Sequence, residues 1–78
     1  MPTIAVDQTL DCSGLACPMP ILKTKKAIDT LTSGQVLKII ATDPGAVADF
    51  EAFSRKTGNV LLESEQGGGK YTFYLKKK

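Results

Sequence analysis

Two prolines set two residues apart, Pro18 and Pro20, constrain this chain more than any other sequence feature. Proline has a fixed φ and no backbone N–H, so it is excluded from helix interiors, but it is tolerated in the first helical turn. A mostly apolar stripe at helical spacing follows at once, made of Ile21, Thr24, Ile28 and Leu31. The pattern therefore predicts a helix over residues 18–32, with Pro18 as its first residue and Cys17 as its N-cap.

A second helix is predicted after residue 42. Asp43 is the expected N-cap and Pro44 the expected first helical residue, and Gly58 ends the helix. Its inner face is expected to carry Ala46, Val47, Phe50, Phe53 and Thr57.

Four segments have the composition of strands: residues 3–11, 36–41, 60–65 and 71–75. Three glycines at 67–69 separate the last two segments and predict a hairpin. A helix between the first two strands predicts a right-handed parallel crossover. The expected fold class is α/β (α+β), a two-layer sandwich of order β-α-β-α-β-β. A mixed four-stranded sheet carries both helices on one face. At 78 residues the chain is expected to form a single domain, residues 1–78.

The chain contains no histidine. This excludes Cys–His and Ser–His nucleophilic catalysis and histidine metal ligands. The two cysteines, Cys12 and Cys17, are fewer than a structural zinc site requires, so neither a metal nor another cofactor is expected. A net charge of +2 is too low to predict direct nucleic-acid binding. Neither a signal peptide nor a membrane-spanning run is visible, so a cytoplasmic location without membrane contact is expected.

Cys17 is the candidate nucleophile, because the predicted helix start places its sulfur near the backbone N–H of Met19. The positive end of a helix lowers the pKa of a thiol, and the thiolate is the reactive form. With no general base beside it, such a thiolate does not readily activate water, which favours a stable covalent carrier over a hydrolase. Cys12 is interpreted as a small, partly buried residue at the end of a strand.

The opposite side of the first helix carries a second clue: Met19, Leu22, Lys23 and Lys26. Apolar residues among cations on a solvent-facing helix predict a docking face for an acidic partner protein. The terminal lysines, residues 76–78, are interpreted instead as a solvated tail.

Residues 11–20 read Asp-Cys-Ser-Gly-Leu-Ala-Cys-Pro-Met-Pro. They resemble the Asp-x-x-Gly-Leu-x-Cys-Pro-x-Pro signature of TusA-like (SirA-like) sulfur carrier proteins. The resemblance implies that Cys17 accepts a sulfane sulfur as a persulfide. It also implies that Pro18, Met19 and Pro20 shape the helix start, and that Gly14 and Leu15 form the approach loop.

The resemblance further implies a sulfur donor of the cysteine desulfurase or rhodanese type and an acceptor sulfurtransferase. The pathways served by the family are tRNA thiolation, molybdenum cofactor assembly and sulfur oxidation. Residues 41–45 are similar to the branch linked to sulfur oxidation. The carrier is expected to be a monomer, because a thiol that must be presented to partners needs no second copy.

Two other functions stay open at this point. The chain is alternatively a non-catalytic regulatory or RNA- or protein-binding module in which Cys17 is structural. It is also possible to read Cys12 and Cys17 as a redox pair, although the usual two-residue spacing is absent. Cys12 is not part of the signature, and a disulfide between the two cysteines would resolve a Cys17 persulfide.

Overall fold

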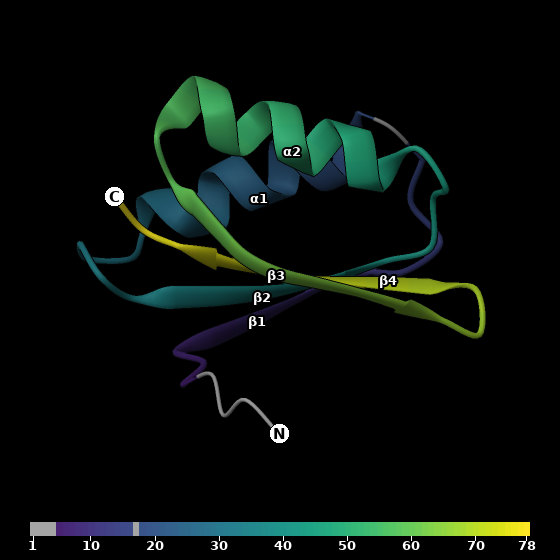
Figure 1. The fold of residues 1–78 in the computed structure, drawn as a ribbon, viewed down its shortest axis with the longest axis horizontal. Coiled ribbons are helices and arrows are strands. Elements are labelled where there is room, and N and C mark those ends of the chain that lie inside the picture. Colours follow the sequence, from purple (N-terminus) through teal and green to yellow (C-terminus); the bar gives the residue numbers. More distant parts are fainter. Residues whose placement is uncertain (1–4, 17) are drawn as a thin grey trace.

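The computed structural model describes residues 5–16 and 18–78 (Figure 1). Its elements are β1 (Gln8–Cys12), α1 (Met19–Asp29), β2 (Val36–Ala41), α2 (Ala46–Thr57), β3 (Val60–Gly67) and β4 (Lys70–Lys76). The strands form one sheet in the order β1-β2-β4-β3. Strand β1 pairs parallel to β2, and the other neighbours are antiparallel. Both helices lie on one face of this mixed sheet (Figure 1), which confirms the expected two-layer sandwich.

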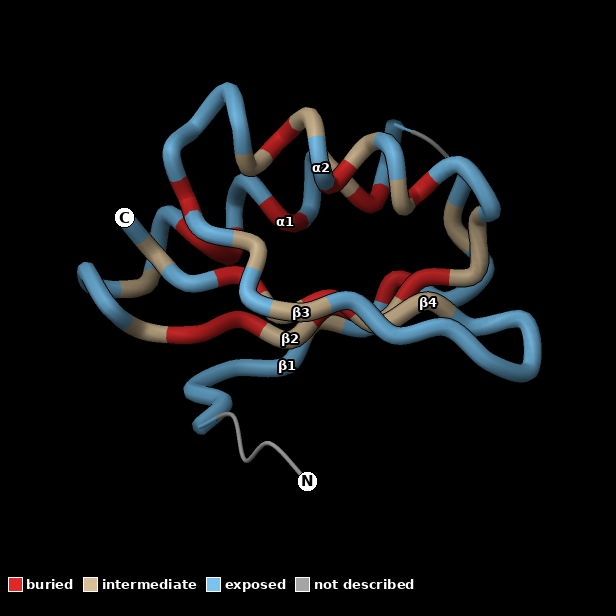
Figure 2. Tube along the Cα trace, in the orientation of Figure 1, coloured by how far each residue is buried: buried red, intermediate tan, exposed pale blue. Residues whose placement is uncertain are grey.

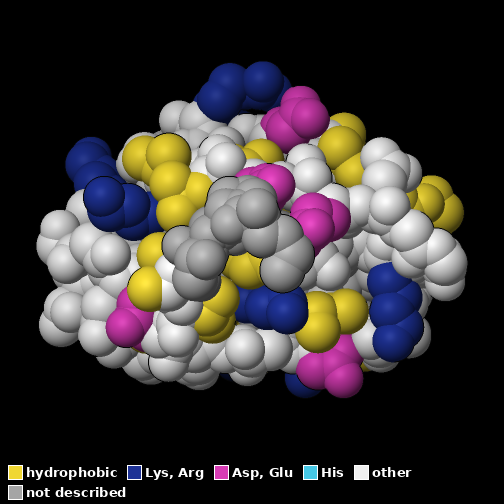
Figure 3. Space-filling view, turned by 60° about the horizontal axis from the view of Figure 1, so that its bottom comes forward, with side chains coloured by type: hydrophobic (Ala, Val, Ile, Leu, Met, Phe, Trp, Pro, Cys, Tyr) yellow, Lys and Arg dark blue, Asp and Glu magenta, His cyan; other side chains and the backbone are white. Residues whose placement is uncertain are grey.

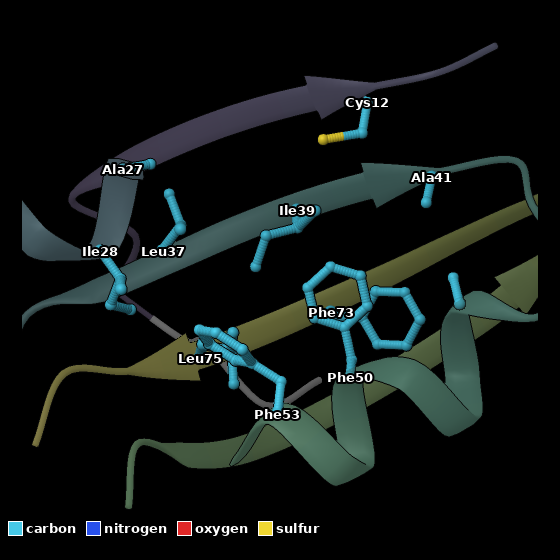
Figure 4. Close-up of a cluster of buried hydrophobic side chains, with 11 residues drawn as sticks. Cys12, Ala27, Ile28, Leu37, Ile39, Ala41, Phe50, Phe53, Phe73 and Leu75 are labelled. Atoms are coloured by element: carbon cyan, nitrogen blue, oxygen red, sulfur yellow. The ribbon is translucent and has the colours of Figure 1, made fainter. Parts of the chain in front are cut away.

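The core lies between the sheet and the helices, where the buried parts of both layers face each other (Figure 2). In β2, side chains at alternate positions point to opposite faces, and Leu37, Ile39 and Ala41 are fully buried beneath the helices. The centre is a stacked aromatic pair, Phe50 of α2 and Phe73 of β4, with ring centroids 4.4 Å apart (Figure 4). The predicted inner faces of the helices supply much of this core, including Ile28, Phe50 and Phe53, whereas Thr57, predicted on the inner face of α2, is exposed.

Both helices begin one or two residues later than predicted. The N-cap of α1 is Pro18, and Cys17, the predicted N-cap, lies outside the described residues. The N-cap of α2 is Gly45, so Asp43 and Pro44 precede the helix. The reason is a turn before it: the Ala46 N–H donates to the Asp43 carbonyl, and the Gly45 N–H donates to Asp43 Oδ1. Asp43 therefore stabilises a turn instead of capping the helix.

Of the strand predicted over residues 3–11, residues 3 and 4 lie outside the described residues, and β1 begins at Gln8 and ends one residue later than predicted, at Cys12. Asp7 nevertheless lies alongside β2: its N–H donates to the Val36 carbonyl at 2.9 Å, and its Oδ2 accepts the Val36 N–H at 2.8 Å. The predicted hairpin is confirmed, with Gly68 and Gly69 both at positive φ in its turn. Within the described ranges, neither helix is long and apolar enough to cross a bilayer.

The prediction of a solvated lysine tail is wrong. Lys76 belongs to β4, and the Lys77 N–H donates to the Gln35 carbonyl at 2.7 Å. The Lys78 N–H donates to Oδ1 of the buried Asn59 at 2.9 Å. The backbone of the lysine run is thus bound to two loops that sequence alone does not place beside it.

Candidate functional site

The candidate site lies at the edge of the sheet where the parallel strands β1 and β2 end. Cys12 and Ala41 are paired across these strands, so the segments that follow them leave the sheet side by side. Helices α1 and α2 both begin at this edge (Figure 1). The carboxyl ends of parallel strands are where α/β folds commonly assemble functional loops. Cys17 itself lies outside the described residues, and its neighbours Ala16 and Pro18 are both exposed.

In the segment between β1 and α1, residues 13–16, the backbone N–H groups of successive residues donate hydrogen bonds that hold the segment in place. The Gly14 N–H donates to the hydroxyl oxygen Oγ1 of Thr42 at 2.8 Å, and the Leu15 N–H donates to the Cys12 carbonyl at 3.2 Å. Gly14 has a φ of +80°, a conformation that favours glycine. Leu15 packs against the core. Gly14 and Leu15 thus form a fixed turn that leads toward Cys17.

Asp11 shapes the start of the same turn. Its Oδ1 accepts the Ser13 N–H at 2.9 Å. Hydrogen bonds from the Ser13 side chain and backbone lower the pKa of the Asp11 carboxyl below its ordinary value, and the charge of Lys70 adds to this. The first residue of the signature is therefore ionised at neutral pH and acts as a turn-stabilising acceptor.

The start of α1 differs from the prediction in a way that matters for Cys17. The Met19 N–H donates to the Ala16 carbonyl at 2.9 Å, and Pro18 and Pro20 have no N–H. The Met19 N–H, expected near the Cys17 sulfur, is thus already bonded to a backbone carbonyl. The positive end of the helix dipole favours an anion at this end of α1.

Cys12 is more deeply buried than predicted. Its exposed fraction is 0%, and Figure 4 shows it among the core side chains next to Ala41. Burial raises the pKa of the Cys12 thiol above its ordinary value, and the opposing effect of the Lys23 charge is smaller. The arrangement makes Cys12 a poor nucleophile.

The four residues of the predicted docking face of α1 lie together on the surface. Met19 and Leu22 are 43% and 49% exposed. A hollow of ≈ 430 Å³, here called the α1 hollow, is lined by Met19, Leu22, Lys23, Lys25, Lys26 and Asp29. It therefore brings together all four predicted residues. Lys25 and Asp29 were missed, although each stands three residues after a predicted member and so lies on the same side of the helix.

A second hollow of ≈ 410 Å³ lies between the two helices. It is lined by Pro18, Ile21, Lys25, Asp49, Ala52, Phe53, Lys56 and Thr57. The sequence did not predict it because its lining residues on the two helices are more than twenty positions apart, and periodicity along one helix does not show which helix lies beside it. Among the described residues, no three His, Cys, Asp or Glu side chains are grouped as metal ligands would be.

The open face of the sheet has mixed charge (Figure 3). Its aromatic residue Tyr74 is engaged by neighbours: the Lys38 ammonium lies 5.9 Å from the ring centroid, and the phenol donates to Glu65 Oε1 at 3.1 Å. A nucleic-acid stacking platform presents free aromatic faces within a basic surface. This face therefore does not favour the RNA-binding alternative.

Comparison with known proteins gives consistent matches over most of the chain. A family model described as sulfurtransferase TusA matches residues 8–77. The sulfur carrier protein TusA of Allochromatium vinosum is 59% identical over 71 residues, which cover 91% of this chain and 93% of that protein. The putative sulfur carrier protein YrkI of Bacillus subtilis is 49% identical over 71 residues, covering 91% and 95%. The crystal structure of a SirA-like protein from Desulfitobacterium hafniense has the same fold. Its TM-score is 0.78 at 22% identity, covering 88% of this chain and 95% of that one.

Proposed function

The chain belongs to the sulfurtransferase TusA family of sulfur carriers, and we propose that it carries sulfur as a persulfide on Cys17. The observation that carries this proposal is the burial of the other thiol. Cys12 is 0% exposed and its pKa is raised, so it is a poor candidate for meeting a partner protein. The exposed residues on either side of Cys17 support its assignment as the reacting cysteine. The same burial argues against a redox pair of Cys12 and Cys17.

The chemistry consists of two exchange reactions at sulfur. The Cys17 thiolate attacks the outer sulfur of a donor persulfide, and the donor cysteine leaves as a thiolate. This gives Cys17–S–SH, in which the outer sulfur keeps the proton it carried on the donor persulfide. An acceptor thiolate then attacks the outer sulfur, and the Cys17 thiolate leaves. Sulfur changes hands at the same oxidation level in both steps, so neither step needs an oxidant, a metal or another cofactor.

The α1 hollow is the proposed docking site for the partners. Met19 and Leu22, which follow Cys17 closely in sequence, provide apolar anchors, and Lys23 and Lys26 provide positive charge at the rim. Such a surface fits an acidic partner with an apolar centre. Transfer rates are therefore expected to fall as salt is added, because salt screens attraction between exposed charges.

The proposed donor is a cysteine desulfurase or a rhodanese-type protein, and the proposed acceptor is another sulfurtransferase. The acceptor determines whether the sulfur enters tRNA thiolation, molybdenum cofactor assembly or sulfur oxidation. The carrier acts as a monomer of one domain in the cytoplasm, where reducing conditions keep a free thiol available.

The test is the intact mass of the protein after incubation with a cysteine desulfurase and cysteine. We expect the wild type to gain the mass of one sulfur and the Cys17→Ser variant to gain none. Cys12→Ala is the matched control, because it removes the buried thiol and should load like the wild type. Equal loading of Cys17→Ser, or no loading of the wild type by any donor of the two proposed types, would refute the assignment.

A further inference from the structure

We propose that Thr42 is a positioning residue for sulfur transfer, because its hydroxyl holds the segment that carries Cys17 in place through Gly14. This inference rests on the proposed function of Cys17. The Gly14 N–H donates to Thr42 Oγ1 at 2.8 Å across 28 residues of sequence. The bond joins the segment after β1 to the segment after β2 at the edge where both helices begin.

The neighbouring hydrogen bonds show why this one is different. The Ser13 N–H is bound by Asp11, and the Leu15 N–H is bound by Cys12. Those acceptors belong to the end of β1, so they set the internal shape of the turn. The bond from Gly14 to Thr42 instead attaches the finished turn to the neighbouring strand.

The position of Thr42 follows from the sheet register. Cys12 and Ala41 are the last paired residues of β1 and β2, and Thr42 comes directly after Ala41. Beyond this point the segments that follow β1 and β2 diverge, each leading to its own helix. The Thr42 hydroxyl therefore continues the connection between the strands after the ladder has ended. Gly14 has a φ of +80°, and a Cβ at this position would meet nothing within 4 Å. Glycine is therefore favoured here by the positive φ of the backbone and not by a lack of room for a side chain.

The described residues before and after Cys17 each have a defined backbone hydrogen bond. Thr42 holds the segment at Gly14, and on the far side of Cys17 the Met19 N–H binds the Ala16 carbonyl at 2.9 Å. A reacting group that is ordered before the partner arrives does not lose that conformational freedom during the reaction. Removal of the Thr42 contact should therefore slow the transfer step and leave docking on the α1 hollow unchanged.

The test compares Thr42→Val, which keeps the shape and removes the acceptor, with Thr42→Ser, which restores the hydroxyl. The readout is the rate of sulfur acceptance from a persulfidated cysteine desulfurase over a range of donor concentrations. We expect Thr42→Val to lower the maximal rate about 5- to 10-fold, with the half-saturating concentration changed less than about 2-fold. Thr42→Ser should stay within about 2-fold of the wild type. If Thr42→Val does not fold, Thr42→Ala takes its place in the same comparison.

Thr57→Val is the matched control, because Thr57 is a hydrogen-bonding threonine at the opposite end of α2. Its hydroxyl donates to the Phe53 carbonyl and accepts from Asn59 Nδ2. We expect this variant to unfold at lower urea concentration than the wild type and to accept sulfur at the wild-type rate. An equal rate loss in Thr57→Val, or a Thr42→Val rate within about 2-fold of the wild type, would overturn the inference.

Failure of the proposed function is recognised separately. If wild-type protein accepts no sulfur, the rate of alkylation of Cys17 by iodoacetamide replaces the transfer assay, because it needs no donor. A rate changed more than about 2-fold in Thr42→Val and restored in Thr42→Ser then supports the positioning role. Equal alkylation rates in the three proteins overturn it.

Discussion

The burial of Cys12 predicts that this thiol is inert in the folded protein. The decisive perturbation is Cys17→Ser, which leaves Cys12 as the single thiol of the chain. Its side chain is 0% exposed, and its backbone is paired with Ala41 in the sheet. A reagent reaches the sulfur only when β1 opens.

The size of the protection follows from the cost of that opening. A stability of roughly 0.05–0.15 kcal/mol per residue gives about 4–12 kcal/mol for a chain of 78 residues. Local opening at an edge strand costs less than complete unfolding, so we take the lower end, about 4 kcal/mol. Because about 1.4 kcal/mol corresponds to a factor of ten, Cys12 should react about 10³-fold more slowly than a free cysteine. The raised pKa of Cys12 acts in the same direction, since it lowers the thiolate fraction at neutral pH.

The assay is the rate of reaction with a chromogenic disulfide reagent at neutral pH. Cys17→Ser should react slowly in buffer and at the rate of free cysteine in high urea. Cys12→Ala, which retains Cys17, should react rapidly under both conditions. A reaction of Cys17→Ser in buffer within about tenfold of free cysteine would refute the burial argument and restore the possibility of dithiol chemistry.

Three further predictions concern the core, the motif turn and the docking surface. Phe50→Ala removes half of the stacked pair with Phe73 and should lower the free energy of unfolding by about 3–5 kcal/mol, and an unchanged urea midpoint would contradict this. Hydrogen bonds from Ser13 lower the pKa of Asp11 below 3.8 in the folded state, so its stabilising contribution is present above pH 3.8 and is lost as the pH falls through the lowered pKa. The free energy of unfolding should therefore depend less steeply on pH in this range for Asp11→Asn than for the wild type. Identical pH dependence in the two proteins would count against the turn interaction. Leu22→Asp should slow sulfur acceptance about tenfold without unfolding the protein. Leu62→Asp, at a similarly exposed leucine on β3, should leave the rate of sulfur acceptance unchanged. Equal effects of the two substitutions would argue against docking on the α1 hollow.

The features that could be predicted from the sequence are those encoded within one segment. The two prolines mark the start of α1 to within a residue, and the dense apolar, β-branched run at residues 36–41 predicts the buried strand β2 with its observed bounds. Helical spacing predicts Met19, Leu22, Lys23 and Lys26 on one side of α1, where they line the α1 hollow. The signature around Cys17 identifies the family for the same reason, because all of its residues are adjacent in the chain.

Tertiary structure decided what depends on contacts between distant segments. The depth of Cys12 is set by how α1 and β2 cover it, so its local sequence indicated only partial burial. The Met19 N–H donates to the Ala16 carbonyl, and this hydrogen bond depends on the closed turn before the helix. Thr42 was not among the predicted site residues, and it becomes part of the site because parallel pairing of β1 and β2 places it beside Gly14. Backbone propensity and hydrophobic periodicity act over a few residues, whereas the hydrogen bond from Gly14 to Thr42 spans 28 residues of sequence. The sequence by itself therefore determined the helices, the strands and the reactive segment. The packing of the strands determined which residue holds that segment.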